Sequence, residues 1–67
     1  MGTFRFHLMG ARQPIDLEVA ASTIGDLDEM LSCRRFVEGR LVEPDSDGVL
    51  RGMLIATSRI ECVVDAD

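Results

Sequence analysis

The sequence contains no lysine, and all seven of its basic residues are arginine. A chain without lysine cannot form a Schiff base through a lysine amine or use lysine as a nucleophile. It also has only two cysteines, Cys33 and Cys62, which is too few for the disulfide framework of a small secreted domain. Their spacing lacks the CxxC or Cys/His pattern of zinc sites. We therefore expect no metal and no other cofactor.

Long apolar runs are missing as well. No run approaches the 18 residues of a membrane-spanning helix, and the first ten residues mix charged and apolar side chains. Such a start forms no apolar core of a signal peptide. Position 6 is Phe6, where a myristoylation site requires Ser or Thr. We therefore expect a cytoplasmic protein that does not contact membranes.

Motifs of catalysis are absent. There is no Gly-rich phosphate loop, no Gly-x-Ser-x-Gly sequence and no pair of carboxylates in a recognisable catalytic pattern. His7, the only histidine, lies on the polar side of an alternating run, where a paired surface role is expected. The segment 45–48 begins like a calcium loop, but Leu54 occupies the position that needs a bidentate Glu. The sequence therefore predicts a protein that is not an enzyme.

Size and charge indicate how such a protein could act. A chain of 67 residues forms at most one domain, spanning residues 1–67, and buries only about 60% of its unfolded surface. Small domains usually gain further stability from a disulfide, a metal or a partner subunit. With the first two disfavoured, the partner subunit remains. The net charge of -5 argues against nucleic acid, whose binders are normally basic.

Hydrophobic periodicity predicts an α+β fold. Period-two alternation marks strands, a 3.6-residue period marks one helix, and the stretch 43–48 carries Pro and Gly at turn positions. The elements follow the order ββαβββ: a β-hairpin, one short helix and a three-stranded antiparallel meander. The expected strands span 3–9, 15–20, 36–43, 49–56 and 59–65, and the expected helix spans 24–33.

Polar residues support the first three of these elements. Arg5 and His7 alternate with the apolar residues of the first strand, so they can meet Asp16 and Glu18 on the second. Thr23 precedes the helical period and is the expected N-cap.

The element order resembles two known folds in outline. Strand–strand–helix–strand is similar to β-grasp, ubiquitin-like folds, although the chain ends Val64-Asp65-Ala66-Asp67 without the Gly-Gly tail of the conjugating members. A bent five-stranded sheet is similar to the small barrel of Sm-like proteins, which form rings and bind RNA. Neither resemblance rests on a residue motif. The two therefore stand as alternatives for the shape of the sheet alone.

The last three strands are apolar on both faces. One face would carry Gly39, Leu41, Gly52 and Leu54, and one short helix can cover only that face. The other face mixes apolar side chains with arginine, as protein interfaces do. We therefore expect a non-catalytic binding and assembly module that acts as a homo-oligomer, with a dimer favoured. Its predicted interface consists of Phe36, Arg40, Val42, Val49, Arg51, Met53, Ile55, Arg59 and Val63.

Two other functions remain as alternatives. The first is a small RNA- or nucleic-acid-binding barrel, and the second is a thiol-based activity at Cys33, which ends the helix and precedes two arginines. Neither the identity of a small-molecule ligand nor the biological process is indicated. The arginines of the nucleic-acid alternative are Arg34, Arg35, Arg40, Arg51 and Arg59.

Overall fold

The first two strands form because apolar and polar residues alternate along them. In the computed structural model, which describes residues 1–67, β1 spans Gly2–Leu8 and β2 spans Ile15–Val19. They pair antiparallel as a hairpin, with Phe4 opposite Leu17. Phe4, Phe6 and Leu17 are buried. The predicted hairpin is therefore confirmed, with its apolar face turned to the core.

The helix α1 spans Ile24–Cys33, the range that the sequence predicts. Thr23 caps it: the Thr23 hydroxyl oxygen accepts a hydrogen bond of 3.1 Å from the backbone N–H of Asp26. The helix buries Leu27 and ends where Arg34 takes an extended conformation. No helix of the protein is both long and apolar enough to cross a membrane.

Three more strands follow the helix, so the predicted order ββαβββ is confirmed. β3 spans Phe36–Leu41, β4 spans Gly52–Ala56 and β5 spans Ile60–Asp65, with the short 3-10 helix η1 at Thr57–Arg59 before β5. β4 is shorter than predicted because residues 42–51 leave the sheet as a loop. The α+β class is therefore that of a five-stranded antiparallel sheet with one helix.

The last three strands do not form one continuous meander. The sheet order is β4-β3-β2-β1-β5, so β5 lies beside β1 at the other edge from β4. η1 carries the chain from one edge of the sheet to the other, where β5 pairs antiparallel with β1. The prediction that β5 follows β4 in the sheet was wrong, because sequence spacing alone does not show which strand a neighbour pairs with.

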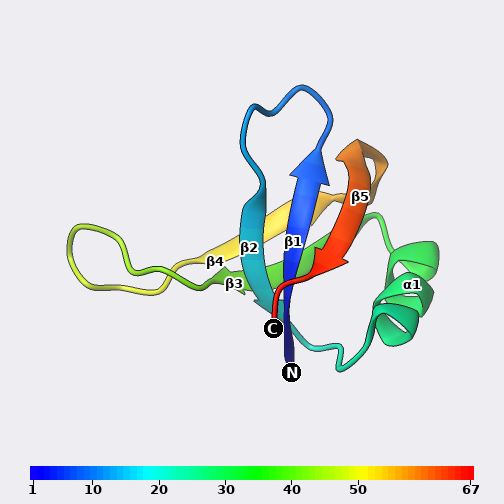
Figure 1. Cartoon of the computed structure of the whole chain (residues 1–67), viewed down its shortest axis with the longest axis horizontal. Coiled ribbons are helices and arrows are strands. Elements are labelled where there is room, and N and C mark those ends of the chain that lie inside the picture. Colours follow the sequence, from blue (N-terminus) through cyan, green and yellow to red (C-terminus); the bar gives the residue numbers. More distant parts are fainter.

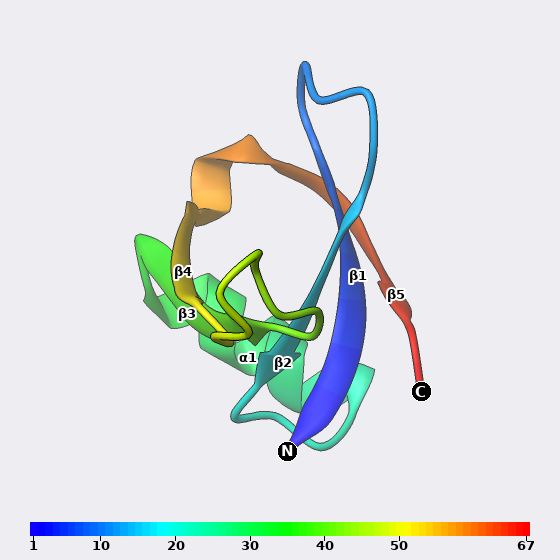
Figure 2. The same ribbon diagram turned by 90° about the vertical axis from the view of Figure 1, so that its left-hand side faces the viewer.

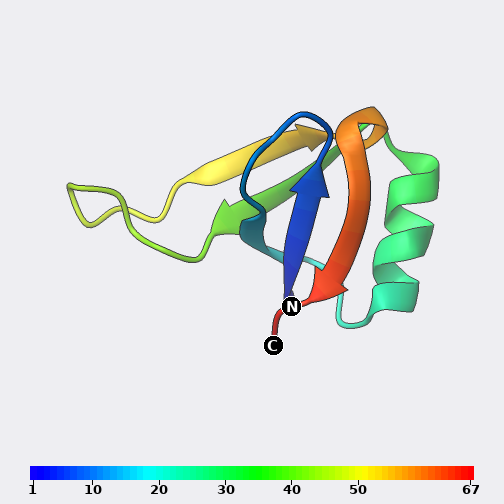
Figure 3. The same ribbon diagram turned by 45° about the horizontal axis from the view of Figure 1, so that its top comes forward.

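The sheet curls around its core and remains open. β3 and β4 cross behind β1, β2 and β5 in Figure 1, and Figure 2 shows the same curl from the side. Figure 3 shows α1 beside β5, across the open side of the curl. Because β4 and β5 are the two ends of the strand order and do not pair, the bend resembles a small barrel that is not closed.

The core lies on the inner face of the curl. Partly buried side chains from every strand and from α1 pack around it, among them Leu31, Leu41 and Ile60. No buried side-chain nitrogen or oxygen lacks a hydrogen-bond partner. The eight buried residues of the core are Phe4, Phe6, Leu17, Val19, Ala21, Leu27, Val37 and Ile55.

The inner face of β4 is the opposite of the predicted one. Ile55 is only 3% exposed and Met53 packs against the core, whereas Leu54 is exposed. The reason is pairing: Ile55 lies directly opposite Val37, and directly paired residues share a face of the sheet. Since both faces of β4 read as apolar, alternation along the sequence could not fix its register, and the contact with β3 decides it.

β5 also turns a predicted interface residue inward. Ile60 and Val63 both pack against the core, although unbroken alternation would place them on opposite faces. The register against β1 shifts between His7 and Leu8, so β5 contains a bulge with one extra residue. The bulge resets the alternation, and Val63 faces inward opposite Phe6.

Gly39 and Gly52 differ in a way that the sequence does not show. Gly39 is buried, and a Cβ there would lie 2.9 Å from Val19 Cγ1 and 3.1 Å from the Glu18 carbonyl oxygen. Gly52 is exposed, and the nearest atom to a Cβ would be 3.8 Å away. Only at Gly39, therefore, does the approach of β3 to β2 require a residue without a side chain.

We expect the substitution Gly39→Ala to destabilise the fold by about 1–3 kcal/mol, since the added methyl group must displace packed atoms of β2. Gly52→Ala is the matched control and should leave the free energy of unfolding nearly unchanged. Urea unfolding of both variants measures the difference. Equal stability of the two variants would contradict the close approach at Gly39.

Candidate functional site

The nine predicted interface residues lie in three different parts of the structure. It turns three of them to the core, places two on the outer face of β3 and carries four on loops or on η1. Fewer of the predicted residues are therefore exposed on the sheet for self-association. The core-facing residues are Met53, Ile55 and Val63; the outer-face residues are Phe36 and Arg40; the others are Val42, Val49, Arg51 and Arg59.

An exposed apolar patch does lie on the outer face of β3 and β4. Leu54 is 65% exposed and Phe36 is 54% exposed. Since Phe36 pairs with Ala56 and Glu38 pairs with Leu54, the two large side chains are diagonal neighbours on one face. We call Phe36 and Leu54 the outer patch. Sequence reasoning missed Leu54 because it assigned that residue to the inner face.

The outer patch borders an unprotected edge of the sheet. β4 has the sequence Gly-Met-Leu-Ile-Ala, without charge or proline, and it pairs with β3 alone. Edge strands of soluble proteins usually carry charges, proline or bulges, because an unpaired edge is a template for another strand. β4 has none of these features among its five residues.

The free edge of β4 presents a regular set of backbone groups. The Arg51 carbonyl accepts from the Leu41 N–H, and the Thr57 N–H donates to the Arg35 carbonyl, both at 2.8 Å. Positions 51 and 57 therefore face β3, and because successive residues alternate between the two edges, so do 53 and 55. The N–H and C=O groups at 52, 54 and 56 consequently point to the free edge.

The opposite edge of the sheet is protected. β5 carries Glu61 and Asp65, contains the bulge and has α1 beside it (Figure 3). Beyond β5, the Ala66 N–H donates to the Thr3 carbonyl at 3.0 Å, so the chain continues along β1. The two edges therefore differ, and only β4 offers an uncharged strand for pairing.

The loop from 42 to 51 is organised by Asp45. One Asp45 carboxylate oxygen accepts from the backbone N–H groups of Asp47 and Val49, at 2.9 and 3.0 Å, and the other accepts from Arg51 Nε at 2.7 Å. Gly48 closes the turn with a φ of 79°. The hydrogen bonds from Val49 and Arg51 lower the pKa of Asp45. The predicted turn at 43–48 is therefore confirmed.

One of the predicted cross-strand ion pairs also forms. Arg5 lies opposite Asp16, and its Nε and second amino group donate to the two carboxylate oxygens at 2.9 and 3.1 Å. The hydrogen bonds from Arg5 lower the pKa of Asp16, and the same pair raises the pKa of Arg5. His7 does not meet Glu18, because Glu18 lies opposite Thr3 and His7 lies opposite Cys62.

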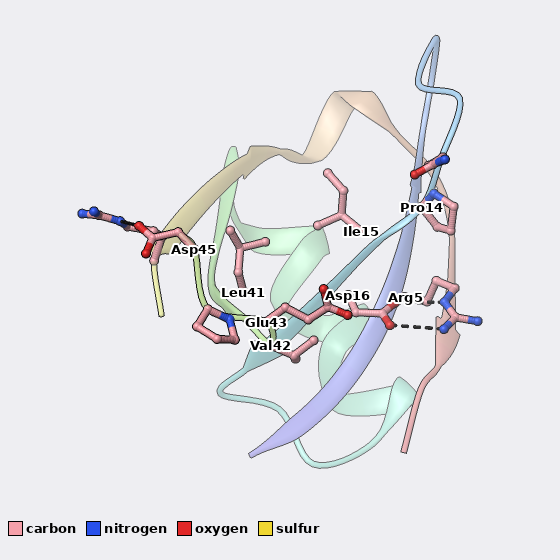
Figure 4. A pocket seen from close by; sticks show the side chains of 11 residues that line it. Arg5, Pro14, Ile15, Asp16, Leu41, Val42, Glu43 and Asp45 are labelled. Atoms are coloured by element: carbon pink, nitrogen blue, oxygen red, sulfur yellow. Dashed lines mark hydrogen bonds and ion pairs between the residues drawn. The ribbon is translucent and has the colours of Figure 1, made fainter. Parts of the chain in front are cut away.

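A groove of about 620 Å³ separates the start of β2 from the loop after β3. Figure 4 shows the Arg5–Asp16 pair at one side of the groove and Asp45 at the other, with Leu41 and Glu43 between them. Both arginines of its lining, Arg5 and Arg51, are held by aspartates. Pro14, Ile15, Val42 and Pro44 contribute apolar surface.

The residues of the two alternative functions are spread over the structure. Arg34 and Arg35 lie next to η1, which carries Arg59, since the Thr57 hydroxyl donates to the carbonyl oxygens of both Arg34 and Arg35. Arg40 lies on β3, and Arg51 is bound to Asp45. Arg34, Arg35 and Arg59 therefore lie together near η1, whereas Arg40 and Arg51 lie at the other end of the β3–β4 pair.

The two cysteines are free and exposed, at the end of α1 and on β5. No side-chain hydrogen bond involves Cys33, and no group of three or more His, Cys, Asp or Glu residues is placed to hold a metal ion.

We expect Asp45 to stabilise the loop only while it is ionised. Because its pKa is lower in the folded chain, this contribution is complete above the ordinary value of 3.8 and is lost as the pH falls through the lowered pKa. The amide NMR shifts of Asp47 and Val49 should titrate at a lower pH in the protein than in a free peptide of residues 43–51. Coinciding titrations would contradict this role of Asp45.

Comparison with known proteins gives no further indication. No protein-family model, no curated protein and no solved structure matches the chain. Function therefore has to be inferred from the exposure, the hydrogen bonding and the charge of the residues described above.

Proposed function

We propose that the protein is a non-catalytic binding and assembly module that forms a homodimer through the free edge of β4. The observation that supports this most is the composition of β4, an edge strand without charge or proline whose partner on one side is missing. The exposed outer patch beside that edge adds apolar surface that pairing would cover.

A two-fold axis through Leu54 satisfies the free backbone groups. An antiparallel pairing of β4 with β4 of a second copy then places Leu54 opposite Leu54 and Gly52 opposite Ala56 of the other copy. The groups at 52, 54 and 56 all face this edge, so each of the three opposed pairs exchanges two hydrogen bonds. The interface is isologous, as expected for a homodimer.

The side chains on the outer face of this pairing match each other in size and polarity. Leu54 packs against Leu54 of the second copy across the axis, on the face where both are exposed. Gly52 and Ala56, the small residues on either side, leave room above the backbone. Across them Arg40 of one copy and Phe36 of the other are three strand spacings apart, roughly 14 Å between Cα atoms. Both side chains can reach over this gap to form a cation–π contact.

This interface retains part of the predicted one and replaces the rest. Phe36 and Arg40 stay at the contact, while Leu54 replaces Met53 and Ile55, which the sequence assigned to the interface. The remaining predicted residues on the loop and on η1 lie outside the register described here.

We expect Leu54→Lys to convert the dimer into a monomer. The pairing would place two lysines opposite each other, and like charges in that position are destabilising. Light scattering after size exclusion, at tens of micromolar protein, should give twice the 7.4 kDa chain mass for the unchanged protein and the chain mass for the variant.

Val64→Lys is the matched control, since Val64 is also an exposed apolar residue on the outer face, but of the other edge strand. It should remain a dimer. Circular dichroism of both variants establishes that the fold is kept. A monomeric unchanged protein, or a dimer that Val64→Lys breaks and Leu54→Lys does not, would overturn the proposal.

A further inference from the structure

The groove between β2 and the loop 42–51 begins where two strands part. β2 and β3 pair at two positions only, Leu17 with Leu41 and Glu18 with Arg40. After Leu41 the chain turns away from β2, and Leu41 itself donates to Arg51 on the β4 side. The start of β2 consequently has β1 on one side and the groove on the other.

This separation leaves one position of the β2–β3 pairing incomplete. Since Leu41 faces β4, its neighbour Arg40 presents its N–H and C=O to Glu18 on β2. Asp16, two residues before Glu18, presents its backbone groups to the same side. Its counterpart is Val42, whose N–H is directed toward the Asp16 carbonyl because Leu17 pairs with Leu41. No backbone hydrogen bond is donated by Asp16, so its N–H faces the groove without a strand partner.

The charges of the groove are complementary to a cation. Arg5 and Arg51 are each held by an aspartate, so neither is free to bind an anion. Glu43 also lines the groove, is exposed and forms no ion pair. Figure 4 shows it between the two pairs. The one charge of the groove that lacks a partner is thus negative.

We propose that this groove binds an extended peptide segment that carries a basic side chain. A peptide carbonyl accepts from the free N–H of Asp16 in the manner of an added strand, the mode by which many domains bind extended peptides. The basic side chain lies against Glu43, and an apolar neighbour packs on Ile15, Leu41 and Pro44. The volume of about 620 Å³ lies within the range of ligand sites.

This site is separate from the proposed dimer interface. The free edge of β4 uses the backbone at 52, 54 and 56, whereas the groove uses the backbone of Asp16 on β2. A protein with both features would hold two peptide segments in one assembly, one on each copy.

The test uses the blocked pentapeptide Thr-Val-Arg-Val-Thr as a probe, titrated into the ¹⁵N-labelled full chain. We expect saturable shifts at the amides of Asp16 and of residues 42–45, and slower hydrogen exchange of the Asp16 amide. A control peptide with Glu in place of Arg should bind more weakly. A peptide that is N-methylated along its backbone should not bind, because it cannot pair as a strand.

The variant Glu43→Gln should weaken binding of the Arg peptide by about two- to fivefold, the effect of one exposed ion pair. It should remove the difference between the Arg and Glu peptides. Glu38→Gln, which makes the same change of charge on the outer face of β3, is the matched control and should bind like the unchanged protein.

Three outcomes of the titration would contradict the proposed peptide site. They are the absence of shifts at millimolar peptide, shifts confined to the amides of 52, 54 and 56, and equal binding of the Arg and Glu peptides. Repeating the titration with Leu54→Lys separates the two proposals. Binding should persist in that monomer, and its loss there would place the peptide at an assembled interface instead.

Discussion

The curl of the sheet depends on the short pairing between β2 and β3. Two residue pairs join these strands, whereas five join β1 to β2 and five join β3 to β4. The short contact therefore acts as the fold line between two better-paired parts of the sheet. Gly39 lies at this line, and its lack of a side chain permits the close contact with Val19 and Glu18.

Both candidate binding sites follow from this fold line. On one side of it, β3 leaves β2 early and opens the groove, where the N–H of Asp16 has no partner. On the other side, the curl ends before β4 reaches β5, so the edge of β4 stays free. Asp45 holds the loop between the two sites through three hydrogen bonds. A single packing constraint thus leaves backbone hydrogen-bonding capacity in two places.

Most charged side chains of the groove are held in ion pairs. The two ion pairs bind Arg5 and Arg51 to aspartates, and no buried polar side-chain atom is without a partner. What remains available in the groove is backbone, apolar surface and the carboxylate of Glu43.

The sequence by itself determined the local elements. Thr23 and the helical period located α1, the turn residues at 43–48 located the loop, and alternation located the first hairpin with its Arg5–Asp16 pair. Each of these depends on residues that are close in the chain or paired across one short connection. Local hydrogen bonding and side-chain periodicity are sufficient to specify them.

Only the tertiary structure decided which face of β4 and β5 is inside. Both faces of β4 are apolar, so its register was set by Val37 opposite Ile55, and that of β5 by a bulge against β1. The same long-range pairing placed β5 beside β1 and left the β4 edge and the Asp16 N–H without partners. Strand partners far apart in the chain are selected by packing of the whole core, which no local pattern records.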